Sequence, residues 1–316
     1  MSAKIYIGPA GWSYPDWAGV VYPLKKTRGF DPLAYLASYF NLIEINSTFY
    51  RLPPPSTAAR WVERVAHAPE FRFTLKGHQD LTHARKPLDP QVVESFKHAL
   101  SPLLDADRLL SVLLQFPWSF RNTAENRRRL EALIETLVPF PVAIEVRHGG
   151  WARDRGLAAL AERGVTVCAV DQPLIGDSLS MRVHHTGEAG AYFRLHGRNK
   201  SEWFRPDTNR DLRYNYLYSP SELAPVADTV RAAAATASQV AVVLNNHFRG
   251  QAVANAIELK AMLAGARVAV PPDLLSAYPR LGAIASSPPK EETRERTGWL
   301  FDSPSSTEDD EEKQDH

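Results

Sequence analysis

The stretch Val142-Ala-Ile-Glu-Val-Arg147 is a short run of apolar and β-branched residues that ends in two charged side chains. Seven more runs of this kind occur along the chain, nearly all of them separated by helical patterns. Mostly continuous hydrophobicity without clean alternation is typical of strands that are covered on both faces. The eight runs are Lys4–Gly8, Leu42–Asn46, Phe71–Lys76, Leu109–Phe116, Val142–Arg147, Val165–Val170, Ala191–His196 and Val240–Asn245.

The segments between these runs carry helix signals. Asp31-Pro32 places a capping carboxylate before a proline at the first helical position. Further candidate caps are Ser56, Asp89, Thr123 and Ser219. The connection from Asp171 to Gly190 is the exception, because its Gly, Pro and Ser residues predict a loop where the helix after strand six would stand.

Eight strand–helix units predict an α/β fold, a (β/α)8 TIM-type barrel of parallel strands. An open doubly wound sheet is the structural alternative. It is disfavoured because Gly8-Pro-Ala-Gly11, after the first strand, does not match the Gly-x-Gly-x-x-Gly turn of dinucleotide-binding folds.

The chain divides into a single barrel domain, residues 1–285, and an acidic tail, residues 286–316. From Pro289 onward there are four Lys/Arg and ten Asp/Glu, a net charge of −6, so the total of +1 leaves about +7 on residues 1–288. The tail contains too little apolar surface to order itself, and we expect it to be disordered. Its apolar cluster Trp299-Leu300-Phe301 is a candidate binding segment for a protein partner or for the basic body; the alternative is a tail without a specific role.

Composition excludes several classes of protein. No apolar run approaches the ~20 residues that cross a bilayer, and the first residues lack a signal-peptide stretch, so we expect a cytoplasmic protein without membrane contact. Cys168 is the only cysteine, which excludes an internal disulfide and a cysteine-based metal cage.

Polar residues are concentrated at the strand ends, where parallel barrels build their functional face. Glu44 and Asn46, Glu145 and Arg147, and Arg194 and His196 are each two positions apart, so the members of each pair point to the same side of their strand. If that side is the interior, charged groups converge on one cavity and must pair with each other, bind an ion or meet a ligand. Structural ion pairs are the alternative for any single residue.

These strand ends supply the candidate site. The candidate catalytic residues are Glu44, Glu145, Asp171 and His196. The candidate substrate-binding residues are Trp12, Tyr14, Asn46, Lys76, Gln115, Arg147, Arg194 and Asn245. The residues of suitable type for a divalent metal, the one cofactor considered, are Glu44, Glu145, Asp171, His196 and His247, although no His-x-His or His-Glu-x-x-His motif supports such a site.

At the same residues the chain resembles the YecE-like family, which is also known as domain of unknown function 72. The resembling segments are Gly11–Tyr14 with Trp17 and Tyr22-Pro23, Glu44–Tyr50 with Pro53, Leu114–Pro117, Glu145–His148 with Trp151, Arg194–Arg198, Tyr216–Tyr218 with Glu222-Leu223, and Asn245–His247 with Gln251-Ala252 and Asn255-Ala256. The resemblance covers about residues 4–264 and implies a TIM-type barrel, but it implies no particular reaction. Pro9-Ala10, where the family usually has small hydroxyl residues, and the acidic tail depart from the family pattern.

Three functions fit these residues. The first is an enzyme that binds an anionic, phosphate-bearing ligand, either a nucleic acid phosphodiester or a sugar phosphate, and acts as a phosphoester hydrolase, with or without a metal, or as an isomerase. The second is a nucleic-acid-binding protein without turnover. The third is a carbohydrate-active enzyme in which Glu44 and Glu145 form the carboxylate pair.

Overall fold

All eight predicted runs form strands, and nearly all of their residues are buried, as expected where both faces of a parallel sheet are covered. The computed structural model describes residues 3–84, 87–153, 155–184, 190–203, 205 and 210–286. The strands are β1 (Lys4–Pro9), β2 (Leu42–Ile45), β3 (Arg72–Lys76), β4 (Leu109–Gln115), β5 (Val142–Glu145), β6 (Thr166–Asp171), β7 (Ala191–Leu195) and β8 (Gln239–Leu244). Each begins and ends within two residues of its predicted position.

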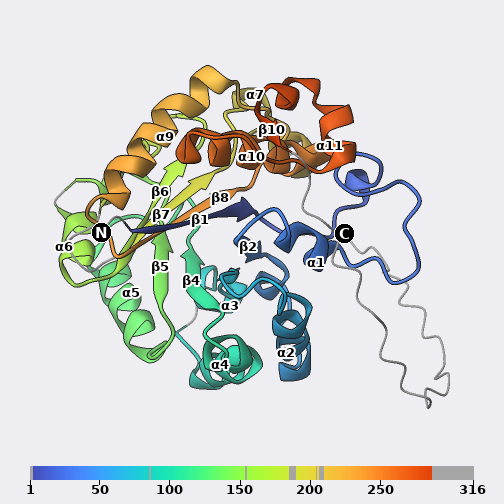
Figure 1. The fold of residues 1–316 in the computed structure, drawn as a ribbon. Helices are drawn as coiled ribbons and strands as arrows, with labels where there is room; N and C mark the ends of the chain where they lie inside the picture. Colours follow the sequence, from blue (N-terminus) through green and yellow to red (C-terminus); the bar gives the residue numbers. More distant parts are fainter. Residues whose placement is uncertain are drawn as a thin grey trace, which may run out of the picture.

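The strands form one parallel sheet in the order β1-β8-β7-β6-β5-β4-β3-β2, and its two edges meet to close a barrel (Figure 1). The edges meet through a parallel bridge between Ala10 and Glu44, where the Gly11 amide donates to the Glu44 carbonyl at 2.8 Å. The predicted (β/α)8 barrel is therefore confirmed, and the open doubly wound sheet is not formed.

A side-chain amide completes the seam between β1 and β2. Asn41 Oδ1 accepts a hydrogen bond from the Ile7 amide at 2.8 Å, and Asn41 Nδ2 donates to the Ile5 carbonyl at 2.9 Å. The two strands also approach closely at Gly8, where an added Cβ would lie 1.8 Å from the Leu42 carbonyl oxygen. The seam therefore depends on a glycine in one strand and on an amide that takes the place of a backbone peptide.

The helices surround the barrel (Figure 1). They are α1 (Pro32–Ala37), α2 (Pro55–Arg64), α3 (Gln79–Thr82), α4 (Pro90–Asp105), α5 (Ala124–Thr136), α6 (Gly156–Glu162), α7 (Lys200–Trp203), α8 (Arg210–Arg213), α9 (Pro220–Ala234), α10 (Gln251–Ala264) and α11 (Pro272–Ala277). Short 3-10 turns are η1 (Pro15–Trp17), η2 (Ser47–Phe49), η3 (Gly149–Trp151), η4 (Phe248–Gly250) and η5 (Pro279–Ile284).

Four of the five predicted helix caps are confirmed. The side chains of Asp31, Asp89, Thr123 and Ser219 accept hydrogen bonds from amides in the first turns of α1, α4, α5 and α9. The prediction for Ser56 is wrong, because α2 begins one residue earlier, at Pro55, after Pro54. Between β6 and β7 the described residues, 172–184 and 190, contain no helix, as predicted.

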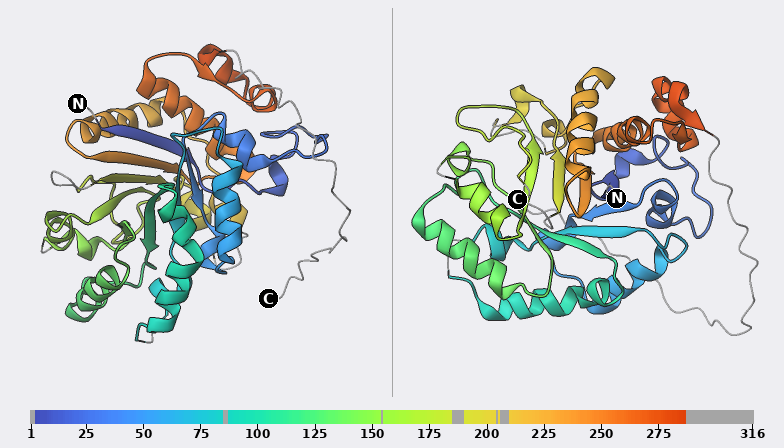
Figure 2. Two further views of the ribbon diagram at one scale, coloured as in Figure 1. Left: turned by 60° about the horizontal axis from the view of Figure 1, so that its bottom comes forward. Right: turned by 60° about the vertical axis from the view of Figure 1, so that its left-hand side comes forward.

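The apolar core has two layers. A large one lies between the sheet and the helices, and a smaller one fills the barrel interior with residues that include Leu113, Cys168, Val170 and Tyr192. After α10 the chain forms β9 (Val268–Ala269), α11 and η5, and returns as β10 (Ala285–Ser286) beside β9. The red helical segment after α10 lies at the edge of the molecule in both views of Figure 2. None of the helices in the described ranges has the length and apolar character needed to span a bilayer. Trp299-Leu300-Phe301 and the rest of the predicted tail from residue 287 lie outside the described residues.

Candidate ligand site at the carboxyl mouth of the barrel

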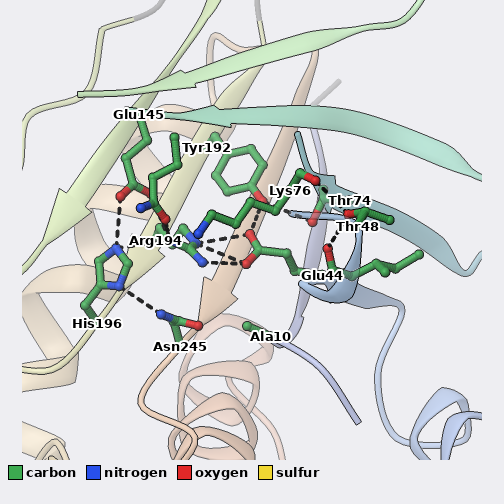
Figure 3. A network of polar contacts seen from close by, with 12 residues as sticks. Ala10, Glu44, Thr48, Thr74, Lys76, Glu145, Tyr192, Arg194, His196 and Asn245 are labelled. Atoms are coloured by element: carbon green, nitrogen blue, oxygen red, sulfur yellow. Dashed lines mark hydrogen bonds and ion pairs between the residues drawn. The ribbon is translucent and has the colours of Figure 1, made fainter. Parts of the chain in front are cut away.

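Strand β7 supplies the centre of the site. Side chains alternate along a strand, so Tyr192 and Arg194 project from β7 to the same side, and His196 follows with the same parity. Tyr192 belongs to the apolar layer that fills the barrel. Arg194 and His196 follow it toward the carboxyl end of β7, where their polar groups lie near Glu145 (Figure 3). The alternation predicted for Arg194 and His196 therefore brings both side chains into the interior.

The Arg194 guanidinium binds two carboxylates, although its side chain is only 2% exposed. Arg194 Nη2 donates to Glu44 Oε1 at 2.6 Å, and Nη1 donates to Glu145 Oε2 at 3.0 Å and to Gln115 Oε1 at 2.9 Å. Burial alone lowers the pKa of Arg194, but Glu44 and Glu145 outweigh it and hold that pKa well above its usual value. Arg194 is thus a permanent cation whose single positive charge is shared by two carboxylates.

Glu44 also has a hydrogen-bond partner in Tyr192. The Tyr192 hydroxyl donates to Glu44 Oε2 at 2.8 Å and lies 3.0 Å from Thr74 Oγ1 (Figure 3). Burial raises the pKa of Tyr192 well above its usual value, so this hydroxyl keeps its proton. Glu44 therefore has charge-assisted contacts on both carboxylate oxygens, which fixes its position.

His196 is neutral and has a partner on each ring nitrogen. Burial lowers the pKa of His196 to about 3. Asn245 Nδ2 donates to Nδ1 at 3.0 Å, so the ring proton is on Nε2, which lies 3.2 Å from Glu145 Oε1 (Figure 3). Burial raises the pKa of the Glu145 carboxyl, but Arg194 outweighs it and holds that pKa well below its usual range. Near neutral pH neither residue gains or loses a proton readily.

Lys76 differs from the other charged groups of the mouth. Its half-buried ammonium makes no hydrogen bond or ion pair with any residue that the structure describes, and Nζ lies 3.7 Å from the centre of the Phe49 ring. Burial, together with the nearby charge of Arg194, lowers the pKa of Lys76 from 10.5 to about 7. Contact with the Phe49 ring stabilises the ammonium by about 0.5–2 kcal/mol, and one pKa unit corresponds to about 1.4 kcal/mol. The ring therefore offsets only part of the decrease in the pKa of Lys76.

Arg147 lies beside Glu145 at the edge of the mouth. Its Nε donates to Glu145 Oε1 at 3.1 Å, and its Cζ lies 5.7 Å from the centre of the Trp203 ring. The positive charge of this region also affects His83, whose pKa falls to about 4 through burial and through the charges of Lys76 and Arg147. Cations on this side of the mouth therefore act on one another without a complete set of anionic partners.

Asp171 belongs to a separate network. Its carboxylate accepts from Arg198 Nη2 at 2.6 Å and from the Tyr218 hydroxyl at 2.9 Å, and Arg198 continues to Glu222. No described contact joins the Asp171 carboxylate to Arg194. The structure therefore does not bring this predicted catalytic residue into the cluster of Arg194, Glu44 and Glu145.

The other predicted residues surround the mouth. Tyr14 donates to the Ala10 carbonyl at 2.8 Å and stacks on the His247 ring at 4.5 Å, so both rings pack against protein. Trp12 makes an edge contact with Trp61. Asn46 is half-buried, and its side chain makes no hydrogen bond with the described residues.

The candidate metal ligands are not assembled into one site. Glu44, Glu145 and His196 bond to Arg194 or to each other, whereas Asp171 pairs with Arg198 and His247 stacks on Tyr14. Within the described part of the chain, no group of three or more His, Cys, Asp or Glu side chains is arranged to hold a metal ion. The residues present do not fit a metal centre.

Sequence reasoning missed three members of the site. Tyr192 has the same parity as Arg194, and Thr74 has the same parity as Lys76, so strand alternation contained the signal for both. His83 follows α3, and no sequence pattern places it near Lys76.

A family model described as "Protein of unknown function DUF72" matches residues 6–278. The chain is 30% identical over 272 residues to the UPF0759 protein YunF of Bacillus subtilis. The aligned region covers 82% of this chain and 94% of that protein. The chain is 35% identical over 150 residues to the UPF0759 protein YecE of Escherichia coli K12, or 46% of this chain and 48% of that protein. The crystal structure of a DUF72 family protein from Thermotoga maritima, TM1631, is 33% identical, with a TM-score of 0.71 over 83% of this chain and 99% of the other.

Proposed function

This chain belongs to the DUF72 family, and from that premise we propose that it is an enzyme that binds a small anionic ligand in the mouth of its barrel. The observation that carries the proposal is the half-buried Lys76 ammonium, which has no acceptor among the described residues. A buried cation without a partner is costly, and an anionic ligand would supply that partner.

The charge balance of the mouth supports an anion. Lys76, Arg147 and Arg194 provide three cationic groups, and Glu44 and Glu145 provide two carboxylates, both of which already bond to Arg194. His196 contributes no charge, because its pKa of about 3 keeps it neutral. A carboxylate or phosphate would thus be held by Lys76 and Arg147 and would balance the remaining positive charge.

The catalytic part of the proposal assigns proton transfer to Lys76. A general acid or base works best when its pKa is close to the working pH, and the pKa of Lys76 is about 7. Glu145 is held ionised and His196 neutral, so their role in this proposal is to fix Arg194 and to shape the mouth. Proton transfer by Lys76 favours an isomerase or a lyase over metal-assisted hydrolysis.

The geometry favours this function over a glycosidase. Glycoside hydrolysis by paired carboxylates requires that one of them be protonated when the leaving group departs. Glu44 and Glu145 share one guanidinium, and the pKa of Glu145 is well below its usual range, mainly through Arg194, which outweighs burial.

The experiment is a titration of the full chain with orthophosphate, pyrophosphate and pyruvate. Calorimetry and NMR measure the binding. We expect binding that weakens as the pH rises through 7, and a large loss of affinity in Lys76→Met and in Arg147→Met. Lys25→Met, which removes an exposed lysine, is the matched control and should bind as the unaltered chain does. If both mouth variants fold and bind these anions normally, the proposed site is wrong.

A further inference from the structure

The second inference rests on the proposed anion site and names the class of substrate that it receives. In it, Lys76 acts as a nucleophile in place of the proton transfer proposed above, and Arg147 holds the anionic group. We propose that Lys76 forms a covalent imine with the carbonyl carbon of an anionic carbonyl compound, one that carries a carboxylate or a phosphate. Lys76 ends β3, at the face of the barrel where the polar groups of the mouth gather, and its side chain lies beside Arg194 and Glu44 (Figure 3).

A comparison with other lysines supports this role. The Lys260 ammonium is also withdrawn from water, but it donates to the Tyr39 carbonyl, so its nitrogen is occupied. Lys97 and Lys4 pair with the carboxylates of Glu94 and Glu70. Lys76 has no such acceptor among the described residues, and its nitrogen therefore remains available to a ligand.

The protonation state of the Lys76 nitrogen also suits nucleophilic attack. Burial and the charge of Arg194 lower the pKa of Lys76 to about 7, so roughly half of the molecules carry the free amine at neutral pH. An exposed lysine carries the amine in roughly one molecule in three thousand at the same pH. Amines activated in this way are the ones that enzymes use to form Schiff bases.

The reaction balances without an oxidant or a reductant. The Lys76 amine adds to the carbonyl carbon, and the electron pair of the C=O bond moves to oxygen. The nitrogen releases one proton and the oxygen takes one up. The hydroxyl of the resulting carbinolamine is protonated and leaves as water, and the nitrogen keeps a double bond to carbon and a positive charge. One proton is consumed and one water is released. The iminium withdraws electrons and acidifies the neighbouring C–H bond, which is the step that isomerases and aldolases need.

Two groups of the mouth are placed to hold the substrate. Arg147 would bind the carboxylate or phosphate, because its guanidinium is only partly used by Glu145. Gln115 accepts from Arg194 through Oε1, while its Nε2 makes no hydrogen bond within the residues that the structure describes. Nε2 is thus free to donate to the carbonyl oxygen during the addition.

The test is reductive trapping of the full chain with cyanoborohydride and three probes: pyruvate, dihydroxyacetone phosphate and uncharged acetone. Peptide mapping by mass spectrometry then locates the adduct. We expect a stable adduct on Lys76 with one or both anionic probes, formed at a rate that rises with a midpoint near pH 7. Pyruvate and dihydroxyacetone phosphate distinguish a carboxylate-bearing from a phosphate-bearing substrate.

The variants separate this inference from the proposed function. Lys76→Met and Lys76→Arg should abolish the adduct, and Lys25→Met should leave it unchanged. Binding of orthophosphate without any trapped adduct would overturn the imine and leave the anion site standing. An adduct on Lys76 that forms equally well with acetone and is not slowed by orthophosphate would support the imine and contradict the anion site. Adducts spread over surface lysines, with the same yield in Lys76→Met, would overturn the imine.

Discussion

Arg194 controls the electrostatics of the mouth because two buried carboxylates depend on one guanidinium. Glu44 bonds to it through Nε and Nη2, and Glu145 bonds to it through Nη1. Breaking a buried ion pair from one side leaves uncompensated charge, which costs more than the pair itself contributes. Arg194 therefore contributes to stability mainly because its removal would leave Glu44 without a cationic partner among the residues that the structure describes and would weaken the charge compensation of Glu145.

We expect Arg194→Met to lower the free energy of unfolding by about 3–5 kcal/mol at pH 7.5, as measured by urea denaturation. Without Arg194, burial would be opposed only by Arg147 and His196, so the pKa of Glu145 would rise from its present low value. A carboxyl with a raised pKa in the folded state gains stability as the pH falls, so the deficit should shrink between pH 7.5 and pH 5.5.

Arg163→Met is the control for this prediction. Arg163 pairs with Glu131 at the surface, where both side chains are exposed, and such pairs contribute about 0–1 kcal/mol. A deficit in Arg194→Met that is as small as that of the control, or one that grows toward pH 5.5, would contradict the prediction.

Lys76 gives a second pH-dependent prediction at this scale. Burial lowers its folded-state pKa to about 7, whereas the unfolded chain keeps the ammonium to higher pH. Between these values the unfolded state binds more protons, so stability rises with pH by up to about 1.4 kcal/mol per unit. Lys76→Met should remove this rise and should stabilise the protein more at pH 6 than at pH 9. Denaturation curves of both proteins and of Lys25→Met at the two pH values measure the difference.

For single residues of the site, the alternation of side chains along a strand predicted which of them share a side, and nothing more. Parity places Arg194 with His196, and Glu145 with Arg147, on one side of their strands without saying which side. The structure shows that Arg194, His196 and Glu145 converge in the interior. Parity does not say which charges pair, because pairing depends on side-chain reach across the barrel. For that reason the joint use of Arg194 by two glutamates, and the lack of a partner for Lys76 among described residues, appear only in the structure.

At the scale of elements, the seam between β1 and β2 has the fewest paired residues among the neighbouring strands of the barrel. The other neighbouring strands share ladders of two or more residue pairs, but these two meet through one bridge and through the Asn41 amide. An amide that replaces a backbone peptide satisfies a donor and an acceptor that would otherwise be buried without partners.

We expect Asn41→Ala to lower the free energy of unfolding by about 1–3 kcal/mol, because it leaves the Ile7 amide and the Ile5 carbonyl without partners. Hydrogen exchange of the Ile7 amide should become faster, which NMR measures directly. Asn126→Ala is the matched control, since Asn126 bonds to a backbone carbonyl at an exposed position. Equal exchange at Ile7 in both variants would show that the seam does not depend on Asn41.

The elements themselves were largely predictable, since apolar runs and capping residues are local signals. Strands such as β4 and β8 follow from their continuous hydrophobicity, and Ser219 caps α9 in a full capping box with Glu222. Ser56 failed as a cap because two prolines before it already start α2. The Asn41 seam was not predictable, because it joins backbone groups more than thirty residues away.

For the whole molecule, the charge is divided unevenly along the sequence. Residues 1–288 carry about +7 and residues 289–316 carry −6, so the near-neutral total conceals a basic body and an acidic tail. The acidic tail is tethered to the basic body, so its carboxylates are present at a high local concentration there. They would therefore compete with external anionic ligands for the basic groups of the body. A nucleic-acid-binding function would therefore be masked in the full chain.

Deletion of residues 289–316 tests this masking. We expect the free energy of unfolding to change by less than about 0.5 kcal/mol, because the deletion leaves the barrel strands and helices intact. If the body binds nucleic acid, the truncated chain should bind a labelled oligonucleotide more tightly than the full chain, and salt should weaken that binding steeply. Replacing Glu308, Asp309, Asp310, Glu311 and Glu312 by their amides keeps the tail length and Trp299, and should reproduce much of the effect if charge is the cause. Failure of the truncated chain to bind at low salt would remove nucleic acid from the possible ligands and leave the small anions of the barrel mouth.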